Sequence, residues 1–279
     1  MARQVATCTM AISPASSIVA RLTATSDPDM RPTVTAYLAG VIGLVPTATL
    51  RNVSARSRNQ RLAPEWPDLP EEFDAAPNSI DSGASWTGLV ADASLQVPKV
   101  VFDLEMVECV WRNVDVTAAT LKGLVCRDVV FEGCDFSGAV LEGAAVTRAQ
   151  FIGCRLTGAA FSGAELNDVV VEGGVANLTN FRMSRSSFLW VQDTSLTDAD
   201  FYGAHLRRGA LLDCDLTGVN LSAAHIDGLC LHGSTLESIR GAAALADAGV
   251  GIDAGQVVPF GVALLGGMGV RVGDRPARL

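Results

Sequence analysis

Large apolar side chains recur every five residues through the middle of the chain, from Val101 to Leu236. Of the 28 positions reached by steps of five, 25 carry a large apolar residue, and the exceptions are Cys126, Ala176 and Ser186. Neither the 3.6-residue turn of an α-helix nor the two-residue alternation of a strand produces this spacing. A short fixed period is typical of repeat architectures, in which successive units stack and bury a continuous core.

The positions around each apolar centre follow the same period. Two residues earlier the side chain is usually small or β-branched, and two residues later it is often glycine, as in CDFSG (134–138) and CRLTG (154–158). Glycine accepts backbone angles that other residues resist, so it favours a turn after each unit. Four units per turn predict a square coil of 20 residues. The 28 units then predict seven coils, stacked over about 34 Å at the inter-strand spacing of about 4.8 Å.

Stacked coils place residues that are 20 apart on top of one another. The interior is therefore predicted to consist of four ladders of like side chains. Two of them are Val101, Leu121, Leu141, Phe161, Phe181, Phe201 and Leu221, and Trp111, Phe131, Phe151, Val171, Val191, Leu211 and Leu231.

The five-residue unit resembles the pentapeptide-repeat family. The family pattern is alanine or cysteine, aspartate or asparagine, leucine or phenylalanine, and then two less restricted residues. The resemblance is strong over about 99–238, and Trp86 in ASWTG (84–88) keeps the same phase upstream. It implies an all-β fold, a right-handed quadrilateral parallel β-helix. The tail from RGAAAL (240–245) onward also resembles the end of small actinobacterial members of the family.

One stretch, between residues 173 and 193, departs from the pattern. The centres weaken to Ala176 and Ser186, whereas Leu178 and Phe188 lie two positions late. The original phase then resumes. We interpret this stretch as a local distortion of one coil and not as a domain boundary.

The ends of the chain differ from the repeats. Residues 1–63 have no periodicity, and we expect a disordered segment or a spurious N-terminal extension. Residues 64–83 hold six acidic residues, no basic residue and several prolines, and they form an acidic lead-in to the β-helix at 84–238. Residues 239–279 are expected to form a short helical cap, because a β-helix must cover its open end. The alternative for this apolar tail is a dimerisation element.

No constellation of residues indicates catalysis, a cofactor or a metal. The cysteines include no C-x-x-C pair, so we expect small buried thiols in a reducing cytoplasm. His205 and His225, on one outward column beside Arg207 and Asp227, allow a weak metal or anion site, although solvated imidazoles are the alternative. A rod with a filled interior offers no pocket, so we expect no enzyme. The apolar run at 34–45 is too short to span a membrane, and we expect no membrane binding.

One outer face is predicted to carry an apolar residue on every coil. Such a stripe on a soluble rod should be covered by the acidic lead-in, by a second copy in a homodimer, or by a partner protein. The alternative is that scattered apolar residues on a β surface need no partner. The candidate interaction face consists of Val110, Val130, Ile152, Val170, Trp190 and Leu212.

These features favour a non-enzymatic interaction scaffold. The family resemblance implies an alternative, a DNA mimic of the quinolone-resistance type that binds DNA gyrase or topoisomerase without binding nucleic acid itself. Such a mimic needs carboxylates arrayed like phosphates, and the formal net charge is −9. Arginines such as Arg112 and Arg155 interrupt the acids, which makes the alternative weaker. The candidate acidic surface consists of Asp115, Asp135, Asp213 and Asp215.

Overall fold

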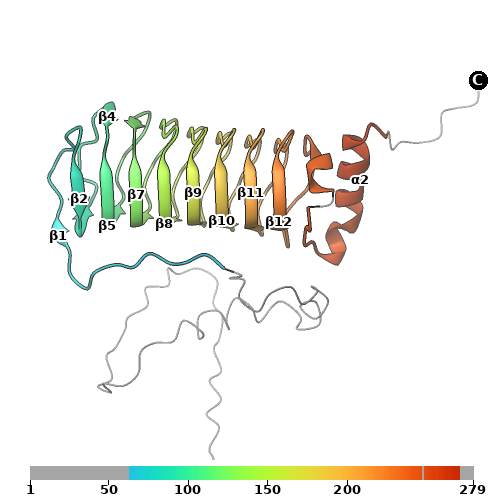
Figure 1. Ribbon diagram of the computed structural model, residues 1–279, viewed down its shortest axis with the longest axis horizontal. Helices are drawn as coiled ribbons and strands as arrows, with labels where there is room; N and C mark the ends of the chain where they lie inside the picture. The colour runs from blue at the N-terminus through green and yellow to red at the C-terminus, as the bar shows by residue number, and fades with distance from the viewer. Residues whose placement is uncertain (1–62, 247, 271–279) are drawn as a thin grey trace, which may run out of the picture. The chain divides into compact units, whose positions relative to one another are not determined.

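The computed structural model describes residues 63–246 and 248–270. The expectation of a disordered or spurious segment at 1–63 falls almost entirely outside these residues. The described chain is a parallel β-solenoid of about seven turns, closed at its C-terminal end by one short helix (Figure 1). This architecture confirms the fold predicted from the five-residue period.

One long strand recurs in each coil and builds the main sheet. These strands are β5 (Glu105–Arg112), β7 (Val125–Glu132), β8 (Ala145–Ile152), β9 (Glu165–Glu172), β10 (Arg185–Gln192), β11 (His205–Leu212) and β12 (His225–Cys230). Upstream, β1 (Asp74–Ala75) and β3 (Leu89–Ala91) extend the sheet, and β2 (Ser85–Thr87) pairs with β5. A second, two-stranded sheet joins β4 (Val100–Phe102) to β6 (Thr120–Lys122).

The pairing register equals the predicted coil length of 20 residues. Phe131 pairs with Phe151 between β7 and β8, and all of these strand pairs are parallel. The register continues through the stretch where the sequence pattern weakens, since Val175 bridges to both Arg155 and Ser195. The stretch at 173–193 is therefore neither a domain boundary nor a break in the ladder.

In that weak stretch the side chains change but the backbone path does not. Ser186 keeps the inward position of a centre and is buried. Phe188, two positions later, is buried at a corner of the coil, whereas Leu178 is 60 % exposed. The two late apolar residues thus lie outside the interior, and the repeat keeps its phase at these coils with smaller centres.

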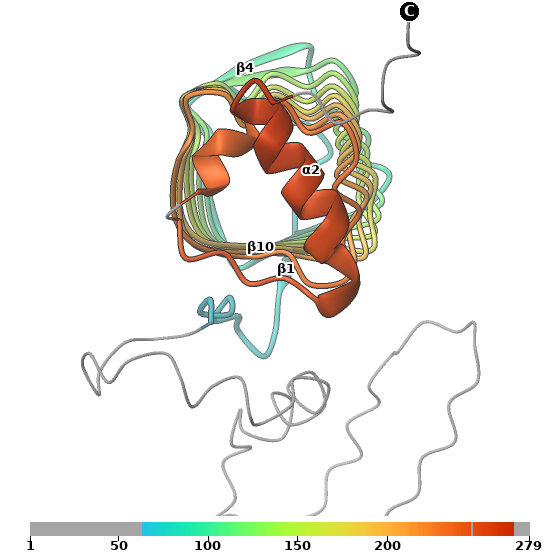
Figure 2. The same ribbon diagram turned by 90° about the vertical axis from the view of Figure 1, so that its right-hand side faces the viewer.

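Aromatic rings stack along the interior ladders as the period predicts. The ring centroids of Phe161 and Phe181 lie 5.4 Å apart, and those of Phe181 and Phe201 lie 4.8 Å apart, both with interplanar angles of 12°. Stacked and edge-to-face aromatic pairs add stability beyond the burial of their area. Viewed along the axis, the coils superpose as a four-sided outline (Figure 2).

The small inward column carries hydrogen bonds that the sequence reading did not predict. The thiols of Cys134 and Cys154 donate to the carbonyls of Trp111 and Phe131, at 3.4 and 3.3 Å. The hydroxyl of Thr179 donates in the same way to the Leu156 carbonyl at 2.8 Å. Small donors therefore satisfy corner carbonyls inside the coil, where an unpaired polar group would cost about 1–3 kcal/mol. All cysteines of the described residues are free.

The C-terminal segment closes the last coil. It comprises the 3-10 helices η2 (Ala242–Leu245) and η3 (Ala254–Gln256) and the helix α2 (Val257–Gly267). The buried amide of Gln256 donates to the carbonyls of Leu231 and Ser234, both at 2.6 Å. A β-carbon at Gly267 would lie 3.0 Å from the Ala243 nitrogen, so glycine permits the close approach of α2 to η2. No helix among the described residues is long and apolar enough to cross a membrane.

Candidate interaction surfaces

One corner of the coil differs from the others in its residues. Each long strand bends there at a residue with positive φ, and in six successive coils that residue is not glycine. An L-residue in this left-handed region costs of order 1 kcal/mol or more. We call these residues the corner column: Glu108, Asp128, Arg148, Asp168, Phe188 and Arg208.

The corner column repays this strain with side-chain contacts along the axis. Arg148 donates two hydrogen bonds to the Asp128 carboxylate, from Nε at 2.6 Å and from Nη2 at 2.5 Å. Arg208 lies over the ring of Phe188 at 5.7 Å. Burial of Asp128 raises the pKa of its carboxyl, but the bonds and charge of Arg148 and the amide of Asp68 outweigh burial, so the pKa is lowered.

The lead-in runs along this corner and is held there by backbone donors. The N–H of Asp68 donates to Asp128 Oδ1 and the N–H of Glu65 donates to Asp168 Oδ1, both at 3.0 Å. Figure 1 shows the lead-in passing beneath successive long strands on its way to β1. Asp128 and Asp168 are nevertheless buried, at 4 % and 8 % exposure. The lead-in is thus a strap on the side of the solenoid.

The strap lies beside the candidate interaction face and divides it. Val110, Val130 and Val170 are buried, with exposures of 2 %, 5 % and 7 %. The other three positions stay accessible to different degrees, since Ile152 is 38 % exposed and Trp190 and Leu212 are half-buried. The valines that follow Asp128 and Asp168 by two residues therefore cannot meet a partner while this face is covered.

A second apolar surface lies on α2. Phe260, Ala263 and Leu264 face the solenoid and pack against its core. The opposite side of the helix is exposed, and no charged residue interrupts it between 254 and 270. We call this side the outer face of α2: Val257, Val258, Val262 and Leu265, with Met268 just beyond the helix. A helix that is apolar on all sides is normally buried on all sides.

The candidate acidic surface is not continuous. Asp115 and Asp135 lie on adjacent rungs, but the next rungs carry Arg155, Val175 and Ser195 before Asp215. Arg155 Nε lies 3.6 Å from Asp135 Oδ2. Asp213 is exposed on the following corner and not on this ladder. The structure thus brings together two of the four predicted acids, with an arginine beside them.

The aspartates of the ladder also hold the turns in place. The Asp215 carboxylate accepts bonds from the amide and hydroxyl of Thr217 and from the Thr235 hydroxyl. These bonds, with the first-ranked contribution from the Thr217 hydroxyl, lower the pKa of Asp215 to about 2. Asp115 and Asp135 accept the amides of Thr117 and Ser137 in the same way. Each is an Asx turn, which favours Asp or Asn at this position of the repeat.

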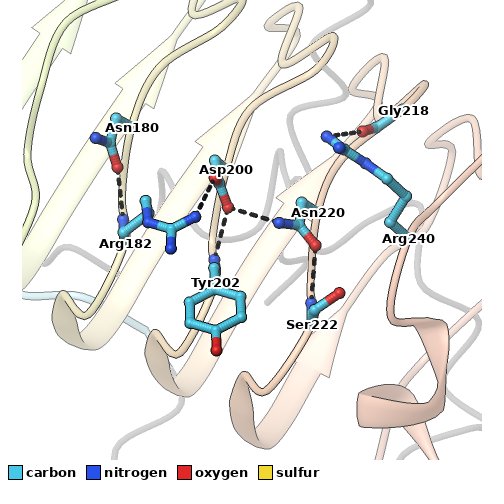
Figure 3. A network of polar contacts seen from close by, with 8 residues as sticks. All are labelled: Asn180, Arg182, Asp200, Tyr202, Gly218, Asn220, Ser222 and Arg240. Atoms are coloured by element: carbon cyan, nitrogen blue, oxygen red, sulfur yellow. Dashed lines mark hydrogen bonds and ion pairs between the residues drawn. The ribbon is translucent and has the colours of Figure 1, made fainter.

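A neighbouring face shows the same device extended into a network (Figure 3). Asp200 Oδ1 accepts the amide of Tyr202 and the side-chain amide of Asn220, both at 2.9 Å. Arg182 donates to Asp200 Oδ2 at 2.9 Å, and its guanidinium lies 4.4 Å from the Tyr202 ring centroid. The polar groups of this network bind one another, which indicates a structural role.

The histidines noted in the sequence do lie together. The rings of His205 and His225 stack, with centroids 4.6 Å apart. The described residues contain no group of three His, Cys, Asp or Glu side chains placed to hold a metal ion. Near the cap, Cys230 Sγ lies 2.7 Å from His232 Nδ1, and burial raises the pKa of the Cys230 thiol.

The sequence reading missed the corner column and the strap. The signal was available in part, because charged residues of alternating sign follow one another at steps of 20 from Asp128 to Asp168. These positions fall outside the five-residue pattern, which describes the inward side chains. Which segment would cover them depends on contacts between residues as far apart as Glu65 and Asp168, and no local pattern encodes such contacts.

Comparison with known proteins agrees with the repeat. Residues 112–145 match a family described as pentapeptide repeats (8 copies), and residues 144–221 match the pentapeptide repeat region family. No curated protein sequence matches the chain.

Solved structures similar to this chain include proteins of three kinds. HetL, from the cyanobacterium Nostoc sp. strain PCC 7120, is 16 % identical and covers 64 % of this chain and 87 % of its own, with a TM-score of 0.27. Full-length QnrB1, a plasmid-mediated fluoroquinolone resistance protein, is 18 % identical, with coverages of 69 % and 95 % and a TM-score of 0.30. A pentapeptide repeat protein of the Arabidopsis thaliana thylakoid lumen is 21 % identical, with coverages of 34 % and 74 % and a TM-score of 0.31.

Proposed function

Because this chain is a pentapeptide-repeat protein, we propose that it acts as a non-enzymatic interaction scaffold and that it self-associates end to end. The observation that carries this proposal is the uncharged outer face of α2, on which Val258 is 74 % and Val257 is 58 % exposed. An exposed apolar face of this kind marks an interaction site. The cap function of the helix needs only its inner side.

A second copy is the occupant that fits the outer face. Two identical apolar faces related by a two-fold axis are self-complementary, and this pairing meets no charge repulsion because residues 254–270 contain no charged side chain. A two-fold axis across the helix also closes the assembly at two copies. Gly261 lies in this face with nothing within 4 Å of a β-carbon placed on it, which leaves a notch for a partner side chain.

The proposal is tested by light scattering of size-separated protein. The full chain is expected to have the mass of a dimer, and the double variant Val258→Asp and Val262→Asp the mass of a monomer. The matched pair Trp190→Ala and Leu212→Ser alters the accessible part of the stripe and is expected to remain dimeric. A dimer that survives the α2 variant but not the stripe variant would move the interface to the stripe, and a wild-type monomer would refute self-association.

The second candidate remains a DNA mimic that binds DNA gyrase, and the stacked pair of Asp115 and Asp135 is the observation that favours it. Competition with DNA through charge would make inhibition of supercoiling depend steeply on salt and on acid count. Asp135→Asn with Asp215→Asn would then weaken inhibition by the purified chain. The interruption of the acidic ladder by Arg155, Val175 and Ser195 is the reason for placing this candidate second.

A further inference from the structure

The long strands carry a group of cations without anionic partners, on the outward side just before the corner column. Residues Arg185 and His205 are register partners on β10 and β11, and Ser187 and Arg207 are the next pair on the same side. His225 follows His205 on β12 and stacks on its ring. Three rungs in succession therefore present a basic group, on a chain whose formal net charge is −9.

Elsewhere on the described coils, arginines are engaged by their neighbours. Arg112 and Arg148 pair with acids 20 residues away, and Arg182 bonds to Asp200. Within residues 63–246 and 248–270, Arg185 and Arg207 have no hydrogen bond, ion pair or ring contact. This holds although Glu165 is the register partner of Arg185 and Asp227 that of Arg207.

Like charges on adjacent rungs are destabilising, so this arrangement costs energy unless something neutralises it. The surface between the cations is also hollowed. A shallow depression of about 390 Å³ is lined by Arg185, His205, Arg207, Ser187, Asn167 and Glu165, with Ser186 at its floor. Ser186 is the position where the repeat has its smallest centre, and a place where the local rules of a fold fail is where a functional site is expected.

We propose that this depression binds a phosphate group, either as the free oxyanion or as the end of a phosphomonoester. A tetrahedral dianion has enough acceptor oxygens for both guanidinium groups and for the N–H of His205, whereas a carboxylate fills one guanidinium fork. The Ser187 hydroxyl and the Asn167 amide add neutral donors on the same side. Glu165, at the edge, opposes the bound charge and limits the affinity. This site is independent of the self-association through α2.

Thermal unfolding and calorimetric titration of the full chain with inorganic phosphate test the site, at ionic strength held constant with sodium chloride. Phosphate is expected to raise the melting temperature saturably, whereas chloride does not. Arg185→Gln with Arg207→Gln is expected to weaken phosphate binding by about tenfold or more for each arginine, because each removes charge-assisted hydrogen bonds. Glu165→Gln is expected to tighten binding.

The matched control is Arg112→Gln with Arg155→Gln, which removes the same charge from other faces and should leave phosphate binding unchanged. Because all four arginines are exposed, far-UV circular dichroism is expected to show an intact solenoid in both variants. O-phosphoserine serves as a second ligand. Tighter binding of phosphoserine identifies a phosphorylated side chain as the source, and equal binding identifies the free oxyanion. Equal responses to phosphate and chloride, or equal loss in both double variants, would overturn the proposal.

Discussion

The lead-in and the cap both cover the coils, but they are held by opposite kinds of contact. The lead-in crosses a side of the solenoid and is fixed by backbone donors to Asp128 and Asp168. The cap closes an end through apolar side chains, chiefly Phe260 and Leu264, and through the Gln256 amide. The lead-in is acidic and solvated on its outer side, whereas the cap presents a second apolar surface. The difference teaches that covering one open edge with an apolar helix creates a new surface that needs its own partner.

The largest effect is expected from deleting residues 241–279. This truncation exposes Leu231 and Leu236 of the last coil and leaves the carbonyls of that coil without Gln256. An open solenoid end with buried apolar residues should fray and aggregate. Deleting residues 1–63 instead should change the melting temperature little. Circular dichroism during heating measures both, and the comparison would fail if the N-terminal deletion were the more damaging one.

Single substitutions on the two sides of α2 separate capping from association. Phe260→Asp places a charge against the core and is expected to cost about 2–3 kcal/mol of unfolding free energy. Val258→Asp lies on the outer face and should change the stability of the monomer by no more than about 0.5 kcal/mol. Urea denaturation at a protein concentration low enough to keep the wild-type chain monomeric makes this comparison. Similar losses in both variants would show that the outer face is also buried within one copy.

Releasing the lead-in should have a smaller, local effect. Asp128→Ala removes the acceptor of the Asp68 amide and leaves Arg148 without its carboxylate, at a cost of about 1–3 kcal/mol. Hydrogen exchange of residues 64–70 should speed up, while exchange in α2 stays unchanged. Asp135→Ala is the control, because its partner Arg155 has a side-chain exposure of 65 % and pairs at the surface. Protection of 64–70 that persists in Asp128→Ala would show that the strap is held by other contacts.

Acid should loosen the lead-in before the cap, with the smallest effect of the series. The pKa of Asp128 is lowered in the fold and that of Asp215 is about 2, below an unfolded value of about 3.9. Each carboxylate therefore contributes stability above about pH 4, and the contribution is lost as pH falls through the folded pKa. For Asp215, which is partly solvated, the contribution is no more than about 1 kcal/mol. Urea titrations between pH 5 and 2 should flatten in Asp215→Asn, and an unchanged slope would contradict this assignment.

The sequence predicted the interior better than the exterior, for a physical reason. A side chain such as Phe151 has to match Phe131 and Val171 on its own ladder, so the period records the packing directly. The outward positions answer to groups elsewhere in the chain. Val130 was predicted to lie on an open stripe, but it is buried beside a segment about 60 residues upstream. The candidate acids were predicted as a surface for a partner, whereas Asp215 first holds its own turn.

The cap was predicted as an alternative between closing the coil and forming a dimer. The apolar composition of residues 256–267 could not decide between them, because the two functions use opposite sides of one helix. Only the placement of Phe260 against the core shows which side remains for association.

The central claim is that two copies meet through the outer faces of α2, and distances between spin labels test it most directly. Labels at Ala254→Cys, next to the helix, should lie within about 30 Å of each other across the dimer. Labels at Lys122→Cys, in an early coil, should be separated by more than about 50 Å, because most of two stacked coil lengths at about 4.8 Å per coil lies between them. Both carry Cys8→Ser and Cys230→Ser to remove other labelling positions. A short distance at Lys122 with a long one at Ala254 would contradict the end-to-end arrangement.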